Sequence, residues 1–144
     1  MSTRALHVAE PPPRYQVRPP LVVDCSVLAA AVFQEETQAA AHESLLRHEL
    51  HAPFLLQCEL ANVALKKFRQ GFEEESRTGL QRALDIGIDL HRIEVQEVAA
   101  LAHQYRLTAY DAAYLWLAAD LRAPLATFDE RLAAAAREFL AKLS

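Results

Sequence analysis

The sequence predicts an α/β fold in which a short parallel β-sheet is flanked by helices on both faces. Short apolar runs alternate along the chain with longer segments rich in Ala and Leu. Strands that alternate with helices are typical of parallel sheets, because each crossover connection lays a helix against the sheet. The chain contains only three glycines and is 52% hydrophobic, a composition that favours helices around a sizeable core.

The first half of the predicted domain begins with a buried strand at residues 21–23, where Leu-Val-Val is apolar and β-branched. Ser26 is expected to cap a helix over residues 26–33. A second helix is predicted over 37–50, followed by a short extended piece at 51–53. The third helix should run over 55–70 and stop at Gly71, since glycine commonly ends helices.

The second half continues the alternation of helices and strands. A helix is expected over 73–85, because three glutamates favour its start and Gly79 is its weak point. Gly87 precedes a predicted strand at 88–91, which leads to a helix over 95–105. Two capping-box patterns then predict helix starts, at Thr108–Asp111 and at Thr127–Glu130. The remaining predicted elements are a helix over 109–121, a strand over 124–127 and a helix over 129–141.

The domain organisation expected from the 144 residues is a flexible Pro-rich arm over 1–20 and one folded domain over 21–144. Prolines at 11–13 and 19–20 block both a helix and a central strand. The formal net charge of −4 argues against a protein that coats nucleic acid, which is usually basic, but does not exclude an enzyme.

The sequence also predicts a cytoplasmic protein without a membrane segment. No apolar stretch is long enough to span a bilayer, and the N-terminus lacks the apolar region of a secretory signal. Cys25 and Cys58 both lie in apolar runs, so we expect them to be buried, reduced thiols rather than a disulfide pair.

Four carboxylates stand inside or beside apolar segments, where a soluble domain does not need them. They are Asp24 in LVVDCSV, Glu59 in LLQCELANV, Asp111 in LTAYDAAYLWLA and Asp129 in PLATFDERL. An isolated buried charge is expensive, so each must find a partner or shift its pKa. A shared divalent cation is one such partner. The pattern therefore predicts a metal-dependent enzyme.

Each carboxylate also has a purely structural explanation that the sequence leaves open. Asp24 could be a turn residue before a helix, although Ser26 is the expected cap. Glu59 could form an ion pair with Lys66. Asp111 and Asp129 could serve the two capping boxes in the first turns of their helices.

The kind of metal follows from the ligands. Carboxylate oxygens without His or Cys select Mg²⁺ or Mn²⁺ rather than zinc or copper. The six histidines are scattered, and His48 and His51 lack a third ligand with metal-site spacing, so no zinc site is expected there.

Four blocks of the sequence resemble PIN-domain ribonucleases, especially the VapC-type toxins of bacterial toxin–antitoxin pairs. VVDCSV resembles the first-strand block, CELANVALKK the helix with an inward Glu, and LTAYDAAYLWLAADLRAPLATFDERL the third and fourth acidic blocks together. The resemblance runs from Leu21 to the C-terminus, whereas the Pro-rich arm has no counterpart. It implies a PIN-like α/β/α sandwich.

The resemblance also implies a site and an activity. Asp24 and Asp111 would be the main metal ligands, Glu59 and Asp129 would complete the cluster, and Ser26 and Thr127 would support it. The implied activity is Mg²⁺- or Mn²⁺-dependent endonucleolytic cleavage of RNA. Alternatives are another metal-dependent phosphate-ester hydrolase and a non-catalytic PIN-like binding module.

The implied partners are an RNA substrate, a cognate antitoxin and a second copy of the chain in a homodimer. Candidate phosphate contacts are the basic side chains Lys66, Lys67, Arg69 and Arg131, which could equally be ordinary solvated charges. Candidate antitoxin-groove residues, which could equally be core residues, are Val27, Leu28, Val32 and Phe33.

Overall fold

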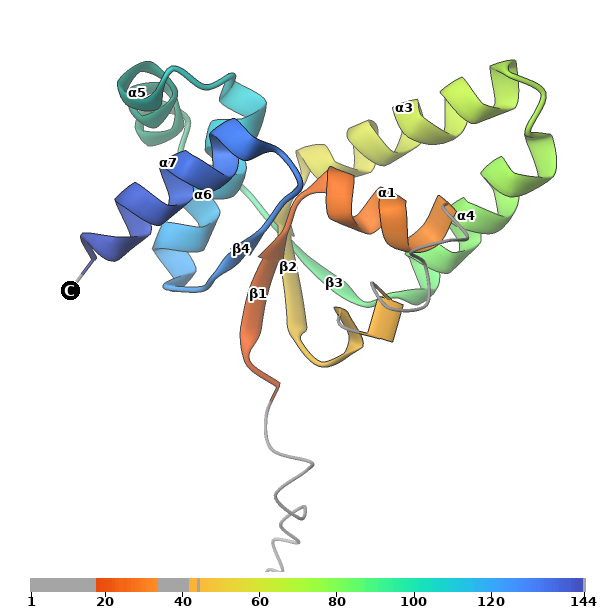
Figure 1. Cartoon of the computed structure of the whole chain (residues 1–144), viewed down its shortest axis with the longest axis horizontal. Coiled ribbons are helices and arrows are strands. Elements are labelled where there is room, and N and C mark those ends of the chain that lie inside the picture. Colours follow the sequence, from red (N-terminus) through yellow and green to blue (C-terminus); the bar gives the residue numbers. More distant parts are fainter. Residues whose placement is uncertain (1–17, 34–41, 44, 144) are drawn as a thin grey trace, which may run out of the picture.

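The predicted fold class is confirmed by a computed structural model that describes residues 18–33, 42–43 and 45–143. Within these residues, one sheet of four parallel strands has the order β3-β2-β1-β4 (Figure 1). Its strands are β1 (Pro20–Val23), β2 (Glu49–Pro53), β3 (Ile88–His91) and β4 (Leu125–Ala126). The carboxyl ends of the central strands β1 and β2 therefore point the same way, as a shared site requires.

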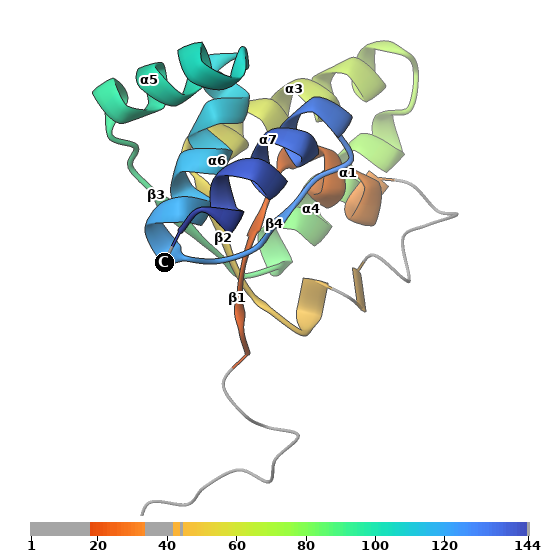
Figure 2. The ribbon, with the colours of Figure 1, turned by 60° about the vertical axis from the view of Figure 1, so that its left-hand side comes forward.

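Helices cover both faces of this sheet (Figures 1 and 2). One face carries α1 (Cys25–Phe33), α3 (Leu55–Arg69) and α4 (Glu73–Asp85), which contact one another. The opposite face carries α5 (Val95–Tyr105), α6 (Ala109–Leu121) and α7 (Glu130–Ala141). Of these, α6 packs directly on β1, β2 and β4, while α5 and α7 pack against α6.

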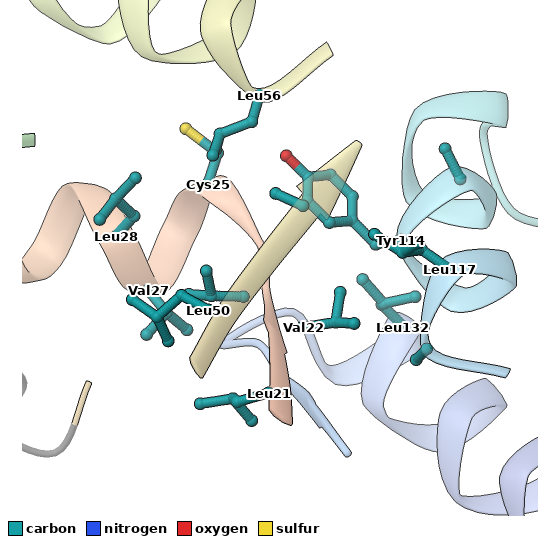
Figure 3. Packing of buried hydrophobic residues seen from close by; sticks show 14 of the residues in the cluster. Leu21, Val22, Cys25, Val27, Leu28, Leu50, Leu56, Tyr114, Leu117 and Leu132 are labelled. Atoms are coloured by element: carbon teal, nitrogen blue, oxygen red, sulfur yellow. The ribbon is translucent and has the colours of Figure 1, made fainter. Parts of the chain in front are cut away.

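The core forms where the two helical layers meet the central strand. Val22 and Val23 of β1 are completely buried, as their β-branched, apolar character predicts. Val22 points toward Leu117 of α6 and Leu132 of α7, whereas Leu50 of β2 lies toward Val27 of α1 (Figure 3). Leu50 is the register partner of Leu21, so the successive residues Leu21 and Val22 of β1 face opposite layers of the core.

The prediction of a helix through Leu50 is wrong at its end. Glu49 and Leu50 belong to β2 and pair in register with Pro20 and Leu21 of β1. Pairing between strands that are distant in sequence overrides the local pattern there. Residues 37–41 and 44 of that predicted helix, and residues 1–17 of the predicted arm, lie outside the described residues. Pro20, which was assigned to the arm, is the first residue of β1.

Two further expectations about local structure are corrected. Ser26 is not the cap of the first helix, because α1 already begins at Cys25 and Asp24 precedes it. Cys58 is exposed on α3, whereas Cys25 is buried as predicted. Within the described ranges, no helix is both long and apolar enough to cross a membrane.

Candidate active site

Asp24 follows the last residue of β1 and is buried, with 5% of its surface exposed. Its Oδ1 accepts hydrogen bonds from the Ser26 hydroxyl at 2.5 Å and from the Val27 backbone N–H at 3.3 Å. Its Oδ2 accepts one from the Thr127 hydroxyl at 2.5 Å. Asp24 itself therefore caps α1, and both of its oxygens act as acceptors, as in a carboxylate.

The two hydroxyls also tie the start of α1 to the loop after β4. The Ser26 oxygen accepts a hydrogen bond from the Phe128 N–H at 3.2 Å, and the Thr127 oxygen accepts one from the Asp129 N–H at 3.0 Å. Each hydroxyl is oriented by a backbone N–H and therefore donates to Asp24 from a fixed direction. The two residues predicted to support the site do contact its central carboxylate.

Glu59 reaches the same region from α3 and is half-buried. Its Oε1 accepts a hydrogen bond from the Tyr114 hydroxyl at 2.6 Å. The considered ion pair with Lys66 does not occur among the ion pairs of the described residues. The carboxylate is held by a neutral donor and keeps its charge uncompensated.

Tyr114 is a site residue that the sequence analysis missed. It is 1% exposed, and its hydroxyl points from α6 toward Cys25 (Figure 3). The signal was present in the sequence, because Tyr114 lies three positions after Asp111 and so shares its helix face. A buried tyrosine hydroxyl needs a hydrogen-bond partner, and here the partner is Glu59.

Asp111 and Asp129 both stand at helix starts. Thr108 caps α6, accepting a hydrogen bond from the Asp111 N–H at 3.1 Å, as the first capping-box pattern predicts. The second pattern is wrong, because Asp129 rather than Thr127 is the cap of α7 and accepts the Leu132 N–H at 2.9 Å. Thr127 turns toward Asp24 instead.

The four acids lie near enough for their charges to affect the pKa values of Glu59 and Asp111. Burial raises the pKa of Glu59 above its ordinary value, and the charges of Asp24 and Asp111 add to this while the Tyr114 hydrogen bond opposes it. Burial likewise raises the pKa of Asp111, helped by Asp129 and Asp24 and opposed by Thr108 and Arg131. Like charges that cannot be separated favour the neutral carboxyl.

Cys25 lies beside these acids but is chemically quiet. Burial raises the pKa of its thiol to about 12, and the nearby charges of Glu59 and Asp24 contribute to the same direction. The thiolate is the nucleophile and metal ligand, so a thiol that stays protonated at neutral pH serves neither role. Cys25 is a packing residue at the floor of the site.

The chemistry of the four acids suits a hard divalent cation, but among the described residues no three of them have ligand atoms within 4.8 Å of one another. All four side chains offer carboxylate oxygens, which Mg²⁺ and Mn²⁺ prefer. None of the ion pairs among the described residues involves Asp24, Glu59, Asp111 or Asp129. Burial is the main cause of the raised pKa values of Glu59 and Asp111, and the neighbouring negative charges, which a bound cation would neutralise, add to it.

The basic side chains differ in their relation to the cluster. Arg131 lies close enough to lower the pKa of Asp111, and its guanidinium donates to the Arg106 carbonyl at 2.6 Å. Lys67 instead lies over the Phe33 ring, with 5.7 Å between its ammonium and the ring centre. Arg131 is therefore the predicted phosphate contact that the structure places beside the acids.

Comparison with known proteins identifies the fold family. A model of the family described as PIN domain matches residues 21–138, which include all four acids. The chain belongs to the PIN domain family. The predicted family is thus confirmed.

Two relatives illustrate the similarity. This PIN domain is 33% identical over 120 residues to Ribonuclease VapC3 of Pyrobaculum aerophilum, covering 78% of this chain and 92% of that protein. It also resembles a crystal structure of PAE2754 from Pyrobaculum aerophilum, with a TM-score of 0.66 and 26% sequence identity. That similarity covers 88% of this chain and 96% of the other.

Proposed function

We propose that this PIN domain is a Mg²⁺- or Mn²⁺-dependent endoribonuclease and the toxin of a type II toxin–antitoxin pair. The observation that carries the proposal is the coupling of four carboxylates around the end of β1. Membership of the PIN domain family and similarity to a protein named a ribonuclease support the hydrolase class.

Each residue has a role within this proposal. Asp24 and Asp111 are the main metal ligands, and Glu59 and Asp129 complete the set. Bound divalent cations would supply activation of a water molecule and neutralisation of charge on the scissile phosphate. Ser26 and Thr127 fix both oxygens of Asp24 by donating hydrogen bonds, which is how supporting residues orient a ligand.

Tyr114 and Arg131 extend the proposed machinery. The Tyr114 hydroxyl holds Glu59 in one orientation while leaving its negative charge for the cation. Arg131 is exposed at the rim and supplies the positive charge for an RNA phosphate. Single-stranded RNA is the proposed substrate, because its unpaired backbone can present a phosphate to the four carboxylates.

The proposed partners are an antitoxin and a second copy of the chain. Of the candidate groove residues, Leu28 is completely buried and packs in the core. Val32 and Phe33 line a hollow together with Lys67 and Phe72, so this hollow is the proposed antitoxin groove. Exposed aromatic surface continues it at Phe72, which is 50% exposed.

The decisive experiment measures cleavage of a single-stranded RNA with Mg²⁺ by the wild type and by Asp111→Asn. The variant keeps the shape of the side chain and replaces a charged ligand by an amide, so cleavage should fall at least a hundredfold. Asp120→Asn is the matched control, an exposed aspartate at the far end of the same helix, and should cleave like the wild type.

The same assay separates the alternatives. A non-catalytic binding module would show no metal-dependent cleavage in the wild type. A different phosphate-ester hydrolase would turn over a small phosphate monoester and leave RNA intact. Undiminished RNA cleavage by Asp111→Asn would refute the proposed site.

A further inference from the structure

A second cluster of titratable side chains lies at the edge of the sheet formed by β2 and β3. Glu49 and His51 are two positions apart on β2, so they share one face of the sheet. Asp89 of β3 is the register partner of His51, which places it on the same face. We call Glu49, His51, Asp89 and the neighbouring His91 the edge cluster.

The contacts in the edge cluster are close. The His51 Nε2 atom lies 2.8 Å from Glu49 Oε1, and the His51 Nδ1 atom lies 2.9 Å from His91 Nε2. Ligand atoms of Glu49, His51 and Asp89 all lie within 4.8 Å of one another. Nitrogen and oxygen ligands bind Zn²⁺ at about 2.0–2.2 Å, so small rotations of these side chains would bring the three ligand atoms around one ion.

The accessibility of these side chains suits an ion arriving from solvent. The His51 side chain is 9% exposed, whereas those of Glu49 and Asp89 are 53% and 71% exposed. The imidazole of His51 is therefore buried and held in place, whereas the two exposed carboxylates have room to rotate toward an ion bound to it. His91 bonds the other ring nitrogen of His51, a contact of the kind that fixes the ring of a metal ligand.

The edge cluster is separate from the acidic site. Glu49 is the first residue of β2 and Asp89 the second of β3, whereas Asp24 follows the last residue of β1. No member of the edge cluster is among the charges that shift the pKa values of Glu59 and Asp111. The two groups therefore differ in position and in chemistry.

We propose that the edge cluster is a second metal site, which binds a divalent transition ion such as Zn²⁺ through Glu49, one ring nitrogen of His51, and Asp89, whose Oδ2 atom lies 3.9 Å from His51 Nδ1. One imidazole nitrogen with two carboxylate oxygens is a donor set that Zn²⁺ accepts. Mg²⁺ takes oxygen ligands and prefers the acidic site. Water molecules complete the coordination, since the two carboxylates are exposed.

The proposed ion would link an edge strand to its neighbour. In the order β3-β2-β1-β4, β3 ends the sheet and has a strand on one side only. Glu49 and His51 come from β2 and Asp89 from β3, so the three ligands meet only when these strands are paired. An ion that binds the folded chain alone raises its thermal stability.

The test is a Zn²⁺ titration of the full chain in excess Mg²⁺, which keeps the acidic site occupied. Imidazole ¹H–¹⁵N spectra should show the His51 resonances moving until one equivalent is bound, and the melting temperature should rise. In Asp89→Asn and Glu49→Gln, Zn²⁺ affinity at His51 should fall at least tenfold. Both positions are exposed, so these variants should fold and retain RNA cleavage.

Two controls make the result specific. Glu138→Gln removes an exposed carboxylate on α7 that pairs with Lys142, and should bind Zn²⁺ like the wild type. Asp24→Asn alters the acidic site and should also keep the His51 response. The proposal is overturned if Zn²⁺ leaves the His51 resonances unmoved, if Asp89→Asn responds like the wild type, or if Asp24→Asn abolishes the response.

Discussion

Tyr114 shows how a single buried hydroxyl can affect the charge state of a neighbouring carboxylate. It donates a hydrogen bond to Glu59 at 2.6 Å, and this bond lowers the Glu59 pKa against the effects of burial and of the neighbouring acids. The bond therefore favours the charged form of Glu59, which a cation requires. Because the hydroxyl is neutral, it orients Glu59 and leaves the negative charge available for the proposed cation.

Replacing Tyr114 by Phe should separate this positioning role from simple packing. The ring still fills its buried site, so stability should fall by about 1–2 kcal/mol, the size of one lost hydrogen bond. The Glu59 pKa should rise further, because a contact that lowers it is gone. The acid limb of the pH profile of RNA cleavage should then move to higher pH. Leu115→Ala, a buried neighbour on the same helix, should lose stability without moving that limb.

Asp24 and Asp111 should respond differently to the same change of carboxylate to amide. Asp24 is buried and accepts three hydrogen bonds, from Ser26, Val27 and Thr127. An amide nitrogen cannot accept, so Asp24→Asn should lower the metal-free stability by about 1–3 kcal/mol. Asp111 is half-buried and repelled by Asp129 and Asp24, so Asp111→Asn should melt at or above the wild type.

Thermal melting without metal checks this contrast, and RNA cleavage with Mg²⁺ provides the second readout. Both variants should lose cleavage. If Asp24→Asn melts like Asp111→Asn, the hydrogen-bond network around Asp24 contributes nothing to stability, and its role is confined to the metal.

At the scale of elements, the close approach of α1 and α4 depends on one glycine. A Cβ built at Gly79 of α4 would overlap the Phe33 ring of α1. The sequence analysis treated Gly79 as a weak point of its helix, but the structure uses the missing side chain for packing. Phe33 in turn lies beneath the ammonium of Lys67, so the contact joins α1, α3 and α4.

Gly79→Ala should therefore destabilise the protein although alanine favours helices. Overpacking typically costs about 1–3 kcal/mol, more than the gain of about 1 kcal/mol in helix propensity. Gly87→Ala is the control, because nothing lies within 4 Å of a Cβ at that position. Chemical denaturation should show a lower midpoint for Gly79→Ala alone, and equal midpoints would mean that the Phe33 ring moves aside freely.

Local sequence patterns predicted most helices and strands. They failed where contacts between distant segments determine the bounds of an element. The bounds of α4, β3, α5 and α6 match the predicted ranges, because apolar periodicity and caps within each segment fix them. The start of β2 was missed because it is set by pairing with β1, about thirty positions earlier in the chain. The register between two such distant strands cannot be read from the local sequence. The caps of the first and last helices were predicted at Ser26 and Thr127, but Asp24 and Asp129 are the caps. The hydroxyls of Ser26 and Thr127 donate hydrogen bonds to Asp24 instead.

For the molecule as a whole, the parallel sheet explains what was predictable about the site. Asp24 follows β1, Asp129 lies just beyond the neighbouring β4, and α6 packs on both strands with Asp111 in its first turn. The sequence analysis placed these acids near one edge, because the carboxyl ends of parallel strands lie together there, and their joining in one metal site stays a prediction. Tyr114 and the edge cluster were missed, since each depends on contacts between distant segments.

The whole-molecule consequence of the acidic site is a pH dependence of stability that reverses with metal. Glu59 and Asp111 have pKa values above their ordinary values of 4.5 and 3.8. A raised carboxyl pKa stabilises the fold below the ordinary pKa, and this contribution is lost as the pH rises through the folded value. The metal-free protein should therefore lose stability from this site between mildly acidic and neutral pH.

Bound Mg²⁺ or Mn²⁺ should change the sign of this dependence. A cation lowers the pKa values of its carboxylates, so their contribution should be present at neutral pH and lost on acidification. At a hundredfold excess over its dissociation constant, the ion should add about 2.7 kcal/mol at neutral pH and almost nothing near pH 4, where protons compete. Melting with EDTA and with Mn²⁺ across this range measures the difference. EDTA should also abolish RNA cleavage, and Mn²⁺ in excess should restore it. Equal melting with and without metal at neutral pH, or full cleavage in EDTA, would show that the four acids do not act as a metal site.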